Sequence, residues 1–180
     1  TDGNEVVKMS TRKANYITLD ELNSEVGKDA VRYFFNMRNI NSHMVFDLSI
    51  AKKKSDENPV FYVQYAHARI NSILNRVKEV QLEISTNNLE LLVHDDEQHL
   101  IKTLFQFEEE VELSADSLET HRICTYLYEL AAAYHRFNKT CRILGTETKL
   151  AEARLALSYA AMIVIKNGLS ILGVSAPEEM

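Results

Sequence analysis

The 180-residue sequence has no tryptophan, only two prolines and only five glycines. Proline and glycine interrupt helices, so their scarcity favours long helices joined by short connections. The sequence also lacks an apolar run close to the roughly 20 residues that cross a bilayer. We find no internal repeat and no low-complexity tract. These absences exclude a membrane-spanning protein and favour a globular, helical one.

The chain has two cysteines, Cys124 and Cys141, which do not form a Cys-X-X-Cys pair. The first ten residues have neither the basic flank nor the apolar stretch of a signal peptide. Isolated cysteines without an export signal are typical of proteins in reducing compartments. We therefore expect a cytoplasmic protein with no membrane partner.

The familiar catalytic and metal-binding motifs are also missing. The sequence contains no GxSxG, P-loop or GxGxxG motif, and no two histidines stand three or four residues apart as in HExxH. His94, Asp95, Glu97 and His99 lie close together, but this spacing is more typical of an acidic helix start than of a metal site. We expect no metal ion, and no catalysis by this chain alone.

The charges are unevenly distributed along the chain. The formal net charge is −6, but the stretch from 95 to 119 has nine acidic residues and one lysine, a local charge of −8, so the rest of the chain sums to +2. Basic residues outnumber acidic ones from 28 to 78. Acidic clusters such as Glu108–Glu110 usually form a solvated surface. The basic stretch includes Lys52, Lys53 and Lys54, which indicate either ordinary soluble surface or contacts with phosphate groups.

Apolar periodicity and capping residues predict an all-α bundle of six or seven helices. Thr18 and Asp47 are expected N-caps, Pro59 suits a first helical turn, and Gly145 is an expected helix end. The predicted helices cover residues 18–27, 29–38, 47–54, 58–84, 95–110, 117–144 and 147–172.

The helix predicted over 58–84 has two unlike faces. Its apolar face, which we expect to form the centre of the core, has the spacing of an amphipathic helix: Val63, His67, Ile70, Ile73, Leu74, Val77, Val80 and Ile84. A second stripe, turned away from the first, aligns tyrosine rings with guanidinium groups: Tyr62, Tyr65, Arg69, Ser72 and Arg76. Such a stripe is typical either of half-buried tyrosines or of a surface on which bases of single-stranded RNA stack.

Four segments, in matching order and spacing, resemble arginyl-tRNA synthetases of the class I aminoacyl-tRNA synthetases. Lys8-Met9-Ser10-Thr11-Arg12 resembles the KMSKS-type loop, and Asp29-Ala30-Val31-Arg32 resembles the DALR signature. Residues 58–69 (NPVFYVQYAHAR) and the ending from 167 to 180 are similar to the corresponding parts of that family. The resemblance extends over essentially the whole chain.

This resemblance implies a C-terminal piece of a ligase that attaches arginine to its tRNA using ATP with Mg²⁺. Residues 1–15 would end the catalytic domain, 16–57 would be connecting helices, and 58–180 would form a DALR-type anticodon-binding bundle. The loop Lys8, Met9, Ser10, Thr11 and Arg12 would lie over the ATP phosphates of an upstream domain. The piece alone is expected to bind no cofactor, to be inactive and to be a monomer.

The resemblance also implies contacts with the anticodon arm. Tyr65 and Arg69 match such positions in the family, and helix geometry adds Tyr62. Further matching positions are Asn138, Arg142 and Met180. Asn138 stands where relatives often have tyrosine, so stacking there is either lost or supplied by Phe137. The alternative function is a helical protein–protein interaction module, in which the Tyr/Arg stripe and the acidic helix are contact surfaces.

Overall fold

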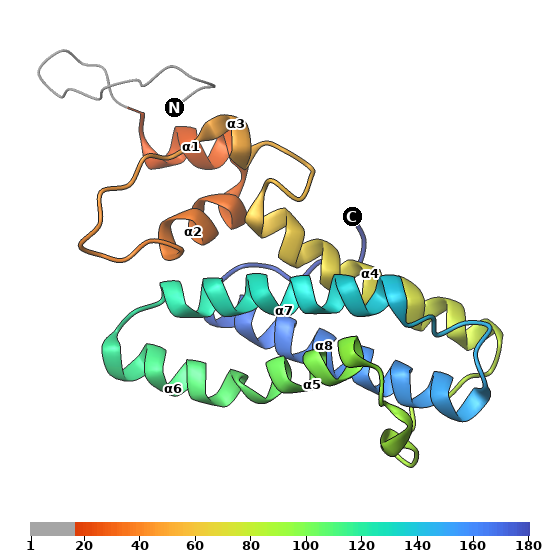
Figure 1. The fold of residues 1–180 in the computed structure, drawn as a ribbon. Coiled ribbons are helices and arrows are strands. Elements are labelled where there is room, and N and C mark those ends of the chain that lie inside the picture. Colours follow the sequence, from red (N-terminus) through yellow and green to blue (C-terminus); the bar gives the residue numbers. More distant parts are fainter. Residues whose placement is uncertain (1–16) are drawn as a thin grey trace, which may run out of the picture.

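The computed structural model describes residues 17–180, which form eight α-helices and one 3₁₀-helix (Figure 1). The predicted all-α fold is confirmed for these residues, and the loop-signature prediction at Lys8–Arg12 lies outside them. The elements are α1 (Leu19–Val26), α2 (Lys28–Asn36), α3 (Leu48–Ala51), α4 (Pro59–Glu79), η2 (Leu89–Leu91), α5 (Asp95–Phe105), α6 (Phe107–Ser117), α7 (His121–Thr140) and α8 (Thr148–Ile171).

Three long helices, α4, α7 and α8, pack against one another and enclose the main core. Val63 and Ile70 of α4, Leu127 and Leu130 of α7 and Ile165 of α8 are completely inaccessible to solvent. Helices α5 and α6 pack along α7, while α1–α3 lie around the first turns of α4 (Figure 1). No helix among residues 17–180 combines the length and apolar character that a bilayer crossing requires.

Helix α4 begins where the sequence predicted and ends earlier. The Asn58 amide donates to the carbonyls of Ala51 and Lys53 at 3.0 and 2.9 Å, which fixes the entry to the helix. Its end is a left-handed residue, Gln81 (φ 54°), followed by a hydrogen bond from Leu82 N to Val77 O. This closing geometry stops the helix at Glu79. The prediction that the helix reaches residue 84 was wrong.

The early end of α4 also changes its predicted apolar face. Val63, His67, Ile70 and Val77 are buried, as predicted, whereas Val80 is 61% exposed. Ile84 is likewise exposed, because the chain has left the helical path before reaching it. The inward face of α4 is therefore confirmed only as far as Val77.

The acidic region folds differently from the prediction. The helix predicted over 95–110 is two helices, because α5 ends at Phe105 and α6 starts at Phe107. The next helix was predicted to begin at Ser117, but the Ser117 hydroxyl bonds back to Leu113 O at the end of α6. Leu118, which has left-handed backbone angles (φ 57°), ends α6, and α7 starts only at His121. Helix α7 then stops at Thr140 rather than near Gly145.

The caps predicted at the other helices are confirmed. Thr18 and Glu21 form a reciprocal capping box at the start of α1. Asp47 accepts from the backbone N–H groups of Ser49 and Ile50 at the start of α3. These local signals were read correctly because a cap depends on residues only two or three positions apart.

Candidate functional site

The outer side of α4 carries tyrosine and arginine side chains in line. Tyr65, Arg69, Ser72 and Arg76 are exposed there at steps of four, three and four residues. Side chains at this spacing are neighbours on one helix face. We call these four residues the α4 ridge; they offer a continuous strip of aromatic and guanidinium surface.

Arg69, at the centre of the ridge, is held by two uncharged partners. Its Nη1 donates to the Tyr65 hydroxyl at 3.2 Å, and its guanidinium carbon lies 5.9 Å from the centre of the Tyr65 ring. The Asn138 amide, with its oxygen turned toward α4, accepts from Arg69 Nε at 2.8 Å and from Nη2 at 3.0 Å. Within residues 17–180 no carboxylate pairs with Arg69. The guanidinium is fixed in orientation while its charge stays uncompensated.

The α4 ridge is one wall of a surface hollow of about 820 Å³. The end of α7 and the α7–α8 connection (141–147) form a second wall, and the C-terminal tail (172–180) forms a third. The hollow is therefore built from three segments that are far apart in sequence. Its lining residues are Tyr65, Ala68, Arg69, Asn71, Ser72, Ile73, Asn75, Arg76, Glu79, Asn138, Arg142, Ile143, Leu144, Glu178, Glu179 and Met180.

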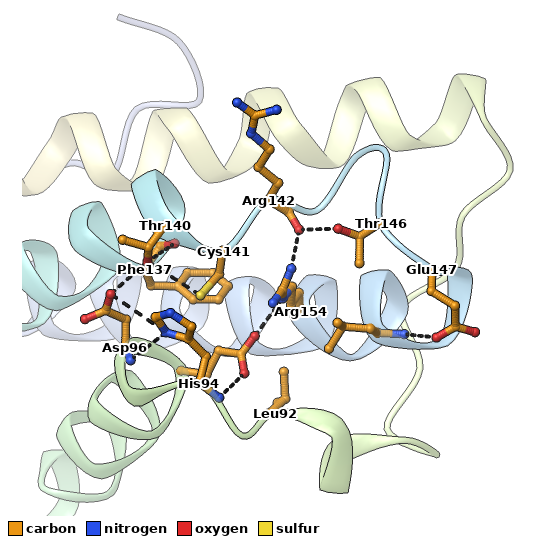
Figure 2. Close-up of polar contacts among 12 residues, drawn as sticks. Leu92, His94, Asp96, Phe137, Thr140, Cys141, Arg142, Thr146, Glu147 and Arg154 are labelled. Atoms are coloured by element: carbon orange, nitrogen blue, oxygen red, sulfur yellow. Dashed lines mark hydrogen bonds and ion pairs between the residues drawn. The ribbon is translucent and has the colours of Figure 1, made fainter.

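Arg142 reaches the hollow from a connection that is anchored on its opposite side. Figure 2 shows the Arg142 carbonyl and guanidinium pointing in opposite directions. Arg154 Nη1 donates to this carbonyl at 2.6 Å, and the Thr146 hydroxyl donates to it at 3.1 Å. The buried Glu97 carboxylate accepts from Arg154 Nε at 2.6 Å. The Glu97–Arg154 pair thus fixes the backbone of Arg142 and leaves its guanidinium in the hollow.

Charges of both signs surround the hollow. Its ionisable lining consists of Arg69, Arg76, Arg142, Glu79, Glu178 and Glu179. A site for phosphate alone would be expected to gather cations and backbone N–H groups without carboxylates beside them. Three guanidinium groups beside three carboxylates instead suit a planar polar group, such as a nucleobase, that can stack on a guanidinium or a ring and form edge hydrogen bonds.

Aromatic rings support Tyr65 from below. The Tyr65 ring lies parallel to Phe61 with centres 6.0 Å apart, and its centre is 5.8 Å from that of His135. Tyr62 is half-buried, 4.6 Å from His135 and 5.0 Å from Tyr128, ring centre to ring centre. Burial raises the pKa of Tyr62 and lowers the pKa of His135, so His135 is uncharged at neutral pH. Tyr65 therefore rests on a rigid, uncharged platform.

The structure brings together five of the six residues that were predicted to contact tRNA. These five residues line the hollow together: Tyr65, Arg69, Asn138, Arg142 and Met180. Tyr62 does not line the hollow, because it packs beneath Tyr65. Phe137 is completely inaccessible to solvent, so it cannot supply the stacking surface that Asn138 lacks.

Sequence reasoning did not single out the asparagines on the same side of α4. Asn71 and Asn75 both line the hollow and stand four residues apart, beside the ridge. Their amides add uncharged donors and acceptors to a surface that otherwise carries guanidinium and carboxylate groups. The detectable signal was this repeat of a polar, weakly helix-forming residue at helical spacing.

Two of the three lysines considered for phosphate contacts are paired with acids. Lys52 Nζ lies 2.7 Å from Glu25, and Lys53 Nζ lies 2.6 Å from Glu57. Together with Lys54 they line a separate hollow of about 510 Å³ next to α2 and the start of α4. Ion pairing lowers the positive charge that this hollow offers, so it is a weaker candidate for nucleic acid than the α4 ridge.

The His94–His99 segment is engaged in capping and in ion pairing. His94 Nδ1 accepts from Asp96 N at 3.1 Å, and the Glu97 carboxylate accepts from His94 N at 2.9 Å, forming a capping box for α5. Glu97 also binds Arg154. Among residues 17–180 no cluster of three His, Cys, Asp or Glu side chains is placed to hold a metal ion.

The curated relatives that match this chain include two arginine–tRNA ligases. The chain is 49% identical over 179 residues to an arginine–tRNA ligase of Salinibacter ruber, and 48% identical over 181 residues to one of Carboxydothermus hydrogenoformans. Each alignment covers 99% of this chain and 32% of the relative. The chain therefore spans about a third of the length of these curated relatives.

A solved structure and a family model complete the comparison. The Thermus thermophilus arginyl-tRNA synthetase superposes with a TM-score of 0.76 at 28% identity, covering 94% of this chain and 29% of that one. The family model described as "DALR anticodon binding domain" matches residues 63–180. This range includes every residue that lines the hollow. On this match over most of its length, the chain belongs to the family of DALR anticodon binding domains.

Proposed function

We propose that the hollow beside the α4 ridge binds bases of the anticodon loop of a tRNA for arginine. The observation that carries the proposal is Arg69: it is exposed, oriented by Tyr65 and Asn138, and left without a compensating carboxylate. Proteins use such fixed guanidinium and aromatic planes to hold unstacked RNA bases. Arg142 and Met180 close the hollow from the other two walls.

The relatives extend this proposal to the parent protein. They are arginine–tRNA ligases about three times as long as this chain, so we infer that it is the tRNA-binding part of such a ligase. The parent would attach arginine to tRNA using ATP with Mg²⁺, in the cytoplasm and as a monomer. Lys8, Met9, Ser10, Thr11 and Arg12 would act on ATP only together with the catalytic domain. This chain alone, mixed with ATP, Mg²⁺ and arginine, should form no arginyl-adenylate in a pyrophosphate-exchange assay.

RNA binding can be tested with a labelled hairpin that carries the anticodon stem-loop of a tRNA for arginine. The matched control is the same hairpin with abasic loop nucleotides, which keeps every phosphate but removes the bases. We expect the abasic loop to bind more weakly by about 1–3 kcal/mol for each stacked base that is lost. Binding of both hairpins should weaken as salt rises.

The outcome separates this proposal from the protein–protein interaction module. Equal binding of the two hairpins would mean that the chain recognises only phosphate, and the base-binding hollow would be wrong. No binding of either hairpin at low salt would remove RNA as the partner and favour the interaction module, with the acidic surface of α6 as a contact surface.

A further inference from the structure

The C-terminal tail, which supplies one wall of the hollow, follows α4 in a defined path (Figure 1). It turns away from α8 at Gly173 (φ 65°), where Arg32 Nε donates to Leu172 O at 3.0 Å. Val174 is then buried in the main core. The apolar anchor thus lies at the root of the tail, several residues before the part that lines the hollow.

Beyond this root, three polar side chains of α4 hold the tail. Gln64 Nε2 donates to Ser175 O at 2.9 Å, His67 Nδ1 is 2.8 Å from Pro177 O, and Asn71 Nδ2 donates to Glu178 O at 3.1 Å. We call Gln64, His67 and Asn71 the α4 ladder; their spacing of three and four residues places them on one side of the helix.

The ladder holds the tail mainly through its backbone, although Gln64 Nε2 also lies 3.4 Å from the Ser175 hydroxyl. Each of the three residues contacts a main-chain carbonyl of the tail. Because a carbonyl only accepts, His67 must carry a proton on Nδ1 and donate it. Gln64 and His67 are both buried, and a buried polar group without its partner is costly. Their presence on the buried side of α4 is explained by this contact with the tail.

Asp29 of α2 completes the arrangement. Its Oδ1 accepts from Ser175 N at 3.2 Å, and its Oδ2 accepts from the Ser175 hydroxyl and from Gln64 Nε2, the latter at 2.9 Å. One carboxylate therefore connects α2, α4 and the tail. Asp29 does not line the hollow, so it can affect a ligand there only through the elements that it holds, α4 and the tail.

We propose that Asp29, Gln64 and His67 are positioning residues for RNA binding. They hold the tail against α4, so that Glu178, Glu179 and Met180 form a fixed wall of the hollow. This inference rests on the proposed function. The binding free energy of RNA would otherwise be reduced by the entropy cost of ordering this wall.

The test removes one residue of the α4 ladder and measures the mobility of the tail directly. Cys124 and Cys141 are buried, and burial raises the pKa of Cys124 to about 12, so neither thiol competes for labelling. A nitroxide attached through Glu179→Cys then reports tail mobility by electron paramagnetic resonance. RNA affinity is measured separately with the stem-loop hairpin on chains without the label.

We expect His67→Leu to give a mobile nitroxide spectrum and an RNA affinity about tenfold lower, since one hydrogen bond that orders the tail is lost. His67→Asn keeps a donor near the position of Nδ1 and should restore both the immobile spectrum and the affinity. If His67 only stabilised the fold, His67→Leu would lower the melting temperature without changing tail mobility and RNA affinity together, and His67→Asn would not restore both.

The second variant, Asp29→Asn, replaces one of two acceptor oxygens by a donor and should also mobilise the nitroxide. It keeps the test decisive if His67→Leu does not fold, which circular dichroism would show. An immobile spectrum in the variants, or a mobile tail with unchanged RNA affinity, would overturn this inference alone. Failure of the unmodified chain to bind the hairpin would overturn the proposed function as well.

Discussion

Arg154, beneath the α7–α8 connection, and Arg69, in the hollow, have partners of opposite kinds. The Arg154 side chain is 13% exposed and pairs with a Glu97 side chain that is 1% exposed (Figure 2). Arg69 is exposed and is held by the neutral Tyr65 and Asn138. The first guanidinium has its charge neutralised within the fold, whereas the second keeps its charge for a ligand. The same residue type can thus serve stability in one region and binding in another.

The largest expected effect is on stability, at Arg154. Arg154→Met leaves the Glu97 carboxylate buried without its counter-charge, so we expect the free energy of unfolding to fall by about 3–5 kcal/mol. Urea unfolding measures this change. The double variant Arg154→Met with Glu97→Gln removes the unpaired charge and should recover part of the loss. A single-variant loss below about 1 kcal/mol would show that the pair behaves like an exposed one.

The next effect is on binding, at Arg69. Arg69→Ala should weaken binding of the anticodon hairpin by about 1–3 kcal/mol, because a fixed guanidinium is lost from the hollow. Its stability should change little, since the side chain is exposed and has no ion pair. Fluorescence titration and urea unfolding measure the two quantities.

Arg136→Ala is the matched control for Arg69→Ala. Arg136 is also an exposed arginine, but it pairs with Asp96 at 3.6 Å and does not line the hollow. Both variants remove one positive charge, so equal losses of RNA affinity would indicate a general electrostatic effect. That result would contradict a specific role for Arg69.

A smaller effect is expected at Tyr65. Tyr65→Phe keeps the stacking ring but removes the hydroxyl that accepts from Arg69. We expect RNA binding to weaken by about 0.5–1.5 kcal/mol, the contribution of one hydrogen bond. Tyr62→Phe is the control, because Tyr62 lies under the ridge and outside the hollow. If Tyr62→Phe weakened binding as much as Tyr65→Phe, the assignment of only Tyr65 to the RNA surface would be wrong.

The sequence predicted the elements whose signals are local. Thr18, Asp47 and Pro59 mark helix starts through their own side chains, and the spacing from Val63 to Val77 predicted the buried face of α4. The end of α4 was missed because Gln81 adopts a left-handed conformation that glycine more often takes. The apolar pattern continued through Val80 and Ile84 and gave no sign of that turn.

The hollow was only partly predictable because its walls meet through tertiary packing. Tyr65 and Arg69 follow from helix spacing, whereas Asn138, Arg142 and Met180 came from family resemblance and not from any pattern in the residues. A polar residue on an apolar face was the overlooked signal. His67 fell within the predicted apolar face of the helix over 58–84, and in the structure its Nδ1 lies 2.8 Å from Pro177 O.

The smallest expected effect concerns pH and sharpens the contrast between the two regions. Burial, and secondarily the positive charge of Arg69, lowers the pKa of His135 in the folded state. Below the unfolded-state pKa of about 6.5, the unfolded chain therefore binds more protons at His135 than the folded chain does. The contribution of neutral His135 to stability is thus lost as pH falls below that value. His135 Nε2 lies 3.4 Å from Tyr62 O, and His135→Gln keeps a side-chain amide near this carbonyl but cannot titrate. Urea unfolding from about pH 7.5 to about pH 5.5 should show a steeper loss of stability for the unmodified chain than for His135→Gln. If the two chains lost the same stability as pH falls, protonation of His135 would cost no more in the folded state than in the unfolded state. The positive charge of Arg69 would then have no effect on His135.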